Sequence, residues 1–115
     1  FADYAPERIL AARIRAASTG GRNAMFLSPN NPYFAELGRR GRSIAWYSPS
    51  LQASAAAANR DESGSAWVAL LSQERIGDVI LRPADTTPAQ RRALEQLGAQ
   101  LRESVGEAQW WSLPE

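Results

Sequence analysis

Two short apolar runs that end in the same dipeptide, Ser-Pro, constrain the fold of this chain more than any other feature. The run "NAMFLSP" occupies 23–29, and the run "SIAWYSP" occupies 43–49. A short, nearly continuous apolar run is typical of a strand that is buried on both faces of a sheet. Each run therefore predicts a strand of a covered sheet, which stops where the proline removes a backbone donor.

Helical patterns lie between and around these runs. Apolar residues recur at helical spacing from Pro6 until "STGG" interrupts the pattern. Asn31 followed by Pro32 is typical of a helix start, and it predicts a short helix over "YFAELGRRG". The alanine-rich stretch favours another helix over 49–57, followed by a loop over 59–65.

The segment "SAWVALLSQERIGDVILRP" at 65–83 reads as a short helix, a break and a third buried strand. Trp67, Leu70 and Leu71 lie at positions i, i+3 and i+4, so one face of this helix is apolar. "ERIGD" interrupts the helical pattern before "VILRP". Such a minimal connection is typical of α/β units.

The stretch from Thr87 to Gly106 predicts the longest helix. Thr87 and Gln90 match a capping box, and Gly106 ends the pattern. Because Leu97 lies at the middle of the apolar stripe, we expect it to be nearly fully buried, whereas Arg92 should face solvent. The stripe consists of Ala93, Leu94, Leu97, Leu101 and Val105.

A last strand is predicted over "AQWWSLP", with Trp110 and Trp111 on opposite faces of the sheet. Strands that alternate with helices pair in parallel through crossover connections, which place helices on both faces. We therefore predict a single α/β domain over 1–115, built as a small three-layer sandwich with a mostly parallel sheet of about four strands. The expected strand order is 2-1-3-4.

The charge balance argues against a nucleic-acid partner. Thirteen arginines face twelve acidic residues, and the net charge is +1. A nucleic-acid binder normally carries a clear basic excess or stripe. The one dense cluster, Arg39, Arg40 and Arg42 in "GRRGRS", is interpreted as a solvated helix end, where cations are favourable.

The residue types also limit the chemistry. The chain has no histidine and no cysteine, which removes a Ser-His-Asp triad, thiolate catalysis and most zinc sites. "TGGRN" follows a helix instead of a strand, so it does not match a phosphate-binding loop. Asp61 and Glu62 are adjacent in a predicted solvated loop, which makes them a weak candidate for an acid and base pair. The sequence predicts no catalytic residue, no metal site and no cofactor.

Ligands of open parallel sheets bind outside the carboxyl ends of the strands. The loops after the three predicted parallel strands should therefore form one edge, where Arg82 would be suited to an anionic group. The alternative is that these polar residues only form turns and caps. The candidate site residues are Ser28, Asn30, Asn31, Ser48, Ser50, Arg82 and Asp85.

The helix and strand over 65–83 also carry a family resemblance. The pattern Trp67, Leu70, Leu71, then Ile76, Val79, Ile80, Leu81 resembles a segment in the soluble C-terminal domains of multi-pass membrane glycosyltransferases that use lipid-phosphate sugars. The preceding stretches "YAPERILAARIR", "NAMFLSP" and "FAELGRRGRSIAWY" look similar as well.

The resemblance implies a periplasmic domain of a bacterial cytoplasmic-membrane protein, cut from a longer chain so that Phe1 follows a transmembrane helix. In such proteins the catalytic carboxylates belong to loops between membrane spans, and none of them corresponds to a position here. The implied partners are the transmembrane part of the same chain and a glycan or lipid-linked sugar.

Two further hypotheses stay open. The chain is alternatively a small ligand- or partner-binding module of a soluble protein, which would use the strand-end edge. It is also conceivable as a self-contained enzyme, in which a carboxylate would have to do the work that histidine does elsewhere.

Overall fold

The computed structural model describes residues 5–17, 21–28, 34–45 and 48–115. Asn30 and Asn31, two of the predicted site residues, lie outside these ranges. The elements are α1 (Ala5–Ala17), β1 (Asn23–Phe26), the 3-10 segment η1 (Phe34–Arg40), β2 (Gly41–Ser43), α2 (Pro49–Asn59), α3 (Ser65–Gln73), β3 (Ile76–Leu81), the 3-10 turn η2 (Pro83–Asp85), α4 (Pro88–Leu97), β4 (Gln100–Val105) and β5 (Ala108–Ser112).

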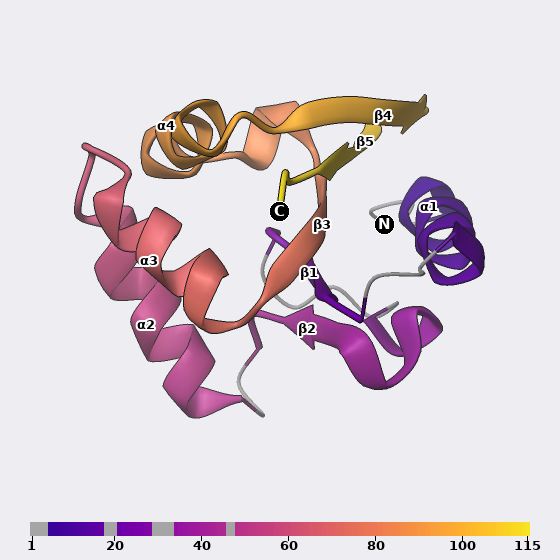
Figure 1. The fold of residues 1–115 in the computed structure, drawn as a ribbon, viewed down its shortest axis with the longest axis horizontal. Coiled ribbons are helices and arrows are strands. Elements are labelled where there is room, and N and C mark those ends of the chain that lie inside the picture. The colour runs from indigo at the N-terminus through magenta and orange to yellow at the C-terminus, as the bar shows by residue number, and fades with distance from the viewer. Residues whose placement is uncertain (1–4, 18–20, 29–33, 46–47) are drawn as a thin grey trace.

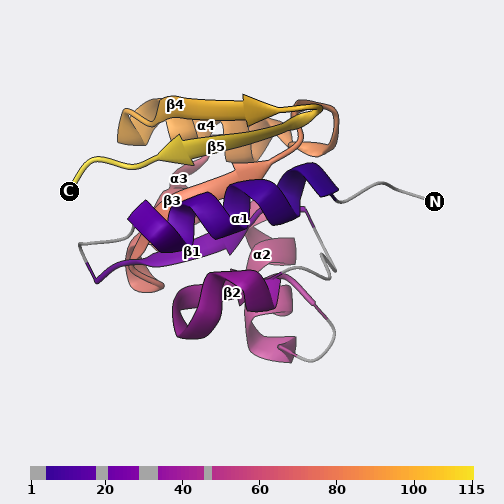
Figure 2. The same cartoon turned by 90° about the vertical axis from the view of Figure 1, so that its right-hand side faces the viewer.

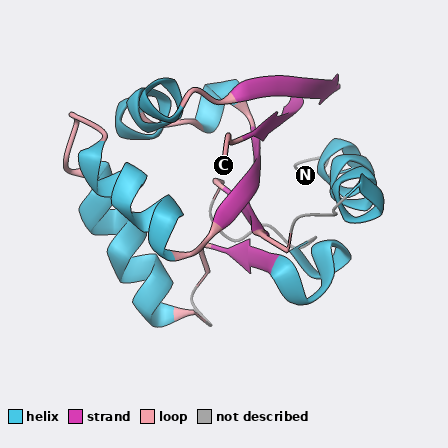
Figure 3. Ribbon diagram, in the orientation of Figure 1, coloured by secondary structure: helices cyan, strands magenta, loops and turns pink. Residues whose placement is uncertain are grey.

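The protein is an α/β sandwich of three layers (Figure 1). A five-stranded sheet in the order β2-β1-β3-β5-β4 forms the middle layer. Helices α2, α3 and α4 cover one face of the sheet, and α1 and η1 cover the other, as the colouring by secondary structure also shows (Figure 3). The predicted class and the helices on both faces are confirmed.

The sheet is mixed, which corrects the prediction of a mostly parallel sheet. β1 pairs in parallel with both β2 and β3, whereas β5 runs antiparallel to β3 and β4. The four predicted strands keep the expected order, and β4 is added at the edge beyond β5. The reason is that β4 forms where the sequence predicts helix, and it pairs with the predicted last strand, β5, as a hairpin.

The long helix predicted from Thr87 to Gly106 is therefore wrong in its second half. Its start is confirmed, because the Thr87 hydroxyl accepts from the Gln90 backbone amide and the Gln90 side chain accepts from the Thr87 amide. The helix ends at Gly98, which adopts the left-handed conformation with φ 70° and ψ 33°. This conformation is open to glycine at little cost and ends a helix.

Burial of the predicted apolar stripe changes accordingly. Leu101 pairs with Trp111 across the hairpin and is 47% exposed instead of buried. Leu97 lies in the last turn of α4 and is only partly buried, which corrects the expectation of nearly full burial. Arg92 is exposed, as predicted.

The second strand also lies earlier than expected. It was predicted over 43–49, but β2 covers Gly41–Ser43 and its register is Ala24 with Gly41 and Phe26 with Ser43. Part of "GRRGRS" thus belongs to a strand, because its backbone groups complete the ladder of β1. Residues 46 and 47 of the predicted strand lie outside the described part of the chain.

Two apolar cores lie on the two faces of the sheet. Met25, Val79 and Trp67 belong to the core under α2, α3 and α4, whereas Phe26 and Ile80 belong to the core under α1. Because successive strand residues point to opposite faces, β1 and β3 each supply both cores. The opposite placement of the two adjacent tryptophans is confirmed, since Trp111 packs on the first core and Trp110 on the second.

Asn59 joins the three helices of the larger core. Its side-chain oxygen accepts a hydrogen bond from Nε1 of buried Trp67 at 2.8 Å and one from the Thr87 hydroxyl at 3.0 Å. The end of α2, the face of α3 and the cap of α4 therefore meet at one amide.

Within the described ranges, no helix combines the length and apolar composition that a membrane crossing requires.

Substitution of Leu94 by alanine tests this core. Leu94 is 7% exposed, so its truncation should leave a cavity and cost about 2 to 5 kcal/mol of unfolding free energy. Leu97→Ala should cost less, because Leu97 is partly buried, and Arg92→Ala should cost no more than about 0.5 kcal/mol. Urea unfolding of the three variants measures this order. A loss for Leu97→Ala as large as that for Leu94→Ala would contradict the end of α4 at Gly98.

Candidate functional site

The carboxyl ends of the three parallel strands meet at one edge of the sheet, as predicted. The Leu27 amide donates to the Ile80 carbonyl at 3.0 Å, which places the segment after β1 beside the end of β3. Ser28 follows there and is half-buried, and Arg82 follows β3. Ser48 lies just before α2, and its amide donates to the Ala45 carbonyl at 2.9 Å.

Arg82 is held by two carboxylates of its own chain. Its Nε and Nη2 donate to the two carboxylate oxygens of Glu7, both at 2.8 Å, and its Nη1 donates to Glu107 at 3.0 Å. The hydrogen bonds that Arg82 donates to Glu7 raise the pKa of Arg82 above its ordinary value. The side chain expected to bind an external anion thus neutralises a buried internal one, since Glu7 is 2% exposed.

The other predicted residues at this edge have structural positions. Ser48 is the N-cap of α2 without a side-chain capping bond, and Ser50 is exposed in the first turn of that helix. Asp85 is exposed at the end of η2, where its amide donates to the Arg82 carbonyl at 2.9 Å. The edge therefore brings Ser28 and Arg82 onto adjacent strand ends, while Ser48 and Ser50 lie beside α2. That these residues bind a ligand stays a prediction.

Sequence reasoning missed Glu7 and Gln90 at this edge. Glu7 lies on the same helical face as Leu10, Ala11 and Ile14, which are all buried. An acidic residue three positions before the first residue of such an apolar stripe indicates a buried carboxylate, which needs a cation as its partner. Gln90 is 3% exposed, and its side-chain nitrogen donates to the Leu27 carbonyl at 3.4 Å, so it links α4 to the end of β1.

Asp61 orders the loop before α3, and it does not pair with Glu62 as an acid and base. Its carboxylate accepts from the Ser63 hydroxyl at 2.6 Å, from the Ser63 amide at 3.1 Å and from the Ala66 amide at 3.1 Å. These bonds, led by the one from the Ser63 side chain, lower the pKa of Asp61 below its ordinary value.

A different hollow lies at the opposite edge, where β1 and β3 begin. It measures about 320 Å³, and the polar side chains that line it are those of Arg15, Arg22, Arg39, Arg40 and Asp78. An adjoining hollow of about 480 Å³ shares Arg22 and Asp78 with it and extends toward Arg102 and Trp110. A third, mostly apolar hollow of about 270 Å³ lies between α4 and the sheet, beside Leu94 and Trp111.

Acidic groups suited to a metal ion are not gathered in the part of the chain that the structure describes. None of its side chains form a group of three or more acids, histidines or cysteines placed to hold one. No protein-family model, curated protein or solved structure matches the chain.

The buried pair between Glu7 and Arg82 predicts a large stability effect. Loss of one partner of a buried pair leaves an uncompensated charge, so Arg82→Met should cost about 3 to 5 kcal/mol of unfolding free energy. The double variant Glu7→Leu, Arg82→Met should cost less than the sum of the single changes, because it removes both charges. Urea unfolding of the four proteins measures the coupling.

Arg13 and Glu103 provide the matched control for this cycle. They also form an ion pair from α1 to the hairpin, but the Arg13 side chain is 51% exposed. Arg13→Met should therefore cost no more than about 1 kcal/mol. A cost for Arg82→Met as small as that for Arg13→Met would contradict a structural role of the buried pair.

Asp61 predicts a pH-dependent difference between the protein and its Asp61→Asn variant. Because the folded-state pKa is lowered, the contribution of Asp61 to stability is present above the pKa of the unfolded chain. It is lost as the pH falls through the lower folded-state pKa. The gap between the two urea midpoints should thus close in acid. Glu62→Gln, in the same turn and exposed, is the control; an equal acid-dependent gap for it would contradict the assignment to Asp61.

Proposed function

We propose that this chain is a non-catalytic extracytoplasmic domain of a polytopic membrane glycosyltransferase-like protein. In this proposal the transmembrane part of the same chain is its partner, and the parent protein handles a glycan or a lipid-linked sugar. The domain then lies on the periplasmic side of a bacterial cytoplasmic membrane.

The observation that carries the proposal is the way α1 enters the domain. Glu7 lies in the first turn of α1 and is bound by Nε and Nη2 of Arg82, which follows β3 at the strand-end edge. The start of α1 and this edge therefore lie at one pole of the molecule, whereas Glu115 lies at the other (Figure 2). A helix that continues from a membrane span through such a pair would hold the domain in a fixed orientation.

The hairpin adds a third element to the same pole. A Cβ atom at Gly106, in the β4–β5 turn, would lie 3.1 Å from Cγ of Pro6, so this turn packs against the start of α1. Glu107 in the same turn also binds Arg82. In the proposal, these three elements form the surface that faces the membrane part of the protein.

Two observations support the non-catalytic character and the resemblance. Arg82 at the strand-end edge binds both Glu7 and Glu107. Charged groups that are paired in this way fit a supporting role better than proton transfer to a substrate. Trp67 and Val79 of the family-like segment are fully buried, so the pattern behind the resemblance forms the packing unit of α3 and β3. Transferase chemistry then belongs to the membrane part of the parent protein.

Cysteine labelling of the full-length protein in its own membrane tests the proposal. This chain has no cysteine, so Glu62→Cys in an otherwise cysteine-free parent gives one exposed label site. We expect a membrane-impermeant maleimide to label it in intact spheroplasts. Ala55→Cys, at a position 1% exposed, should react only after denaturation. Labelling of Glu62→Cys only after lysis, or recovery of the parent protein in the soluble fraction, would overturn the proposal.

A further inference from the structure

The hollow where β1 and β3 begin, lined by Arg15, Arg22, Arg39, Arg40 and Asp78, is called the arginine hollow below. Its side chains come from the end of α1, from the residue before β1, from η1 and from β3. Three segments that are separate in the sequence thus contribute arginines to one hollow. The end of α1 and the beginning of β1, which supply part of this lining, lie at the pole opposite the start of α1 (Figure 2).

The arginine hollow carries excess positive charge. Four arginines line it, together with one acidic residue, Asp78. Asp78 accepts a hydrogen bond from Nε1 of Trp110 at 2.8 Å, which orients its carboxylate. Across the described ranges, neither Arg15 nor Arg39 forms an ion pair. Clustered cations in a concave surface raise the local concentration of anions.

The backbone around the arginine hollow is fixed in an unusual conformation. Gly38 interrupts η1 with φ 72° and ψ −151°, a region that is essentially open only to glycine. A Cβ atom there would lie 3.7 Å from Nε of Arg15, so the Arg15 guanidinium lies over this glycine. Nη1 of Arg42 donates to the carbonyls of Arg39 and Gly41, both at 3.0 Å. These two bonds restrain the backbone that follows Gly38.

Arg22 is held in place on the other side of the arginine hollow. Its Nη2 donates to the Leu113 carbonyl at 2.8 Å, and its guanidinium packs on Gly77, where a Cβ atom would come within 2.8 Å. A cation that is fixed in this way loses little conformational freedom when an anion binds. Arg39 and Arg40 of "GRRGRS" are exposed in the last turn of η1, as the sequence predicts, and they also line the arginine hollow.

We propose that the arginine hollow binds a phosphoryl or pyrophosphoryl group of a small soluble ligand. Planar guanidinium groups bind such oxyanions through two parallel hydrogen bonds, and several of them can share the oxygens of one phosphate. The volume of about 320 Å³ admits one such group with its water. The adjoining hollow of about 480 Å³, reached past Arg22 and Asp78, leaves space for the group attached to the phosphate.

The shape of the charged surface favours a small oxyanion as the ligand over a membrane or a nucleic acid. The arginines line a bounded hollow, whereas proteins bind membranes and nucleic acids through extended basic patches or stripes. The whole chain has a net charge of only +1. The inference is also independent of the membrane proposal, because it rests on the opposite pole of the molecule.

Titration of the protein with inorganic pyrophosphate, followed by amide shifts at constant ionic strength, tests the inference. We expect saturable binding, with shifts at Gly38, Arg39 and Gly41 and around Arg22. The double variant Arg15→Gln, Arg39→Gln should bind at least about tenfold more weakly, because the loss of even one charge-assisted contact costs about that factor. Both side chains are exposed, so the fold should be retained, which the remaining amide spectrum shows.

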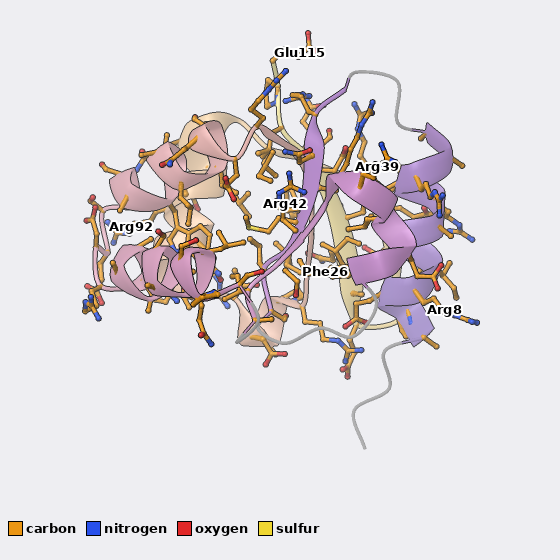
Figure 4. The ribbon with its side chains drawn as sticks, turned by 90° about the horizontal axis from the view of Figure 1, so that it is seen from below. Arg8, Phe26, Arg39, Arg42, Arg92 and Glu115 are labelled. Atoms are coloured by element: carbon orange, nitrogen blue, oxygen red, sulfur yellow. The ribbon has the colours of Figure 1, made fainter. Side chains whose placement is uncertain are left out.

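Arg8 and Arg92 supply the matched control. Both are exposed, and Figure 4 shows Arg8 on α1 away from Arg39, and Arg92 on the far side of the molecule. Arg8→Gln, Arg92→Gln makes the same change in net charge and should leave pyrophosphate affinity within about twofold. Equal weakening by both double variants, or shifts that do not saturate, would overturn the inference. So would binding to phosphatidylglycerol vesicles without binding of free pyrophosphate, which would identify a membrane-binding surface instead.

Discussion

The ion pair between Glu7 and Arg82 is the interaction on which the arrangement of this fold depends. Glu7 has almost no contact with solvent, and a buried carboxylate requires a cation with matched hydrogen bonds. Arg82 satisfies both carboxylate oxygens and reaches Glu107 in the hairpin turn with its remaining fork. One side chain thereby fixes α1, the end of β3 and the β4–β5 hairpin relative to one another.

The pair also explains why the two ends of the sheet differ in chemistry. At the strand-end edge, the cation Arg82 pairs with two carboxylates of its own chain, those of Glu7 and Glu107. At the opposite edge, Arg15 and Arg39 lie around a hollow in which Asp78 is the one carboxylate of the described lining. Arg15 and Arg39 form no ion pair within the described ranges, and the pattern of parallel strands in the sequence gives no indication of this hollow.

The sequence predicted local structure well where a strong local signal decides the outcome. The capping box at Thr87 and Gln90, the helix with Trp67 and the buried third strand are present as expected. The prediction failed after Gly98, where an apolar helical pattern and a hairpin compete. Leu101 and Val105 do continue the helical spacing of the stripe, but their segment pairs with β5 as a strand, and β5 pairs with β3 and covers its edge.

By itself, the sequence determined the α/β class, the order of most elements and the absence of histidine and cysteine chemistry. These follow from periodicity, caps and composition, which act within a few residues. Only the tertiary structure decided that the Arg82 guanidinium binds the Glu7 carboxylate, and that arginines from α1 and η1 line one hollow. Contacts between residues far apart in the chain depend on how α1 crosses the sheet, and no local spacing encodes that crossing.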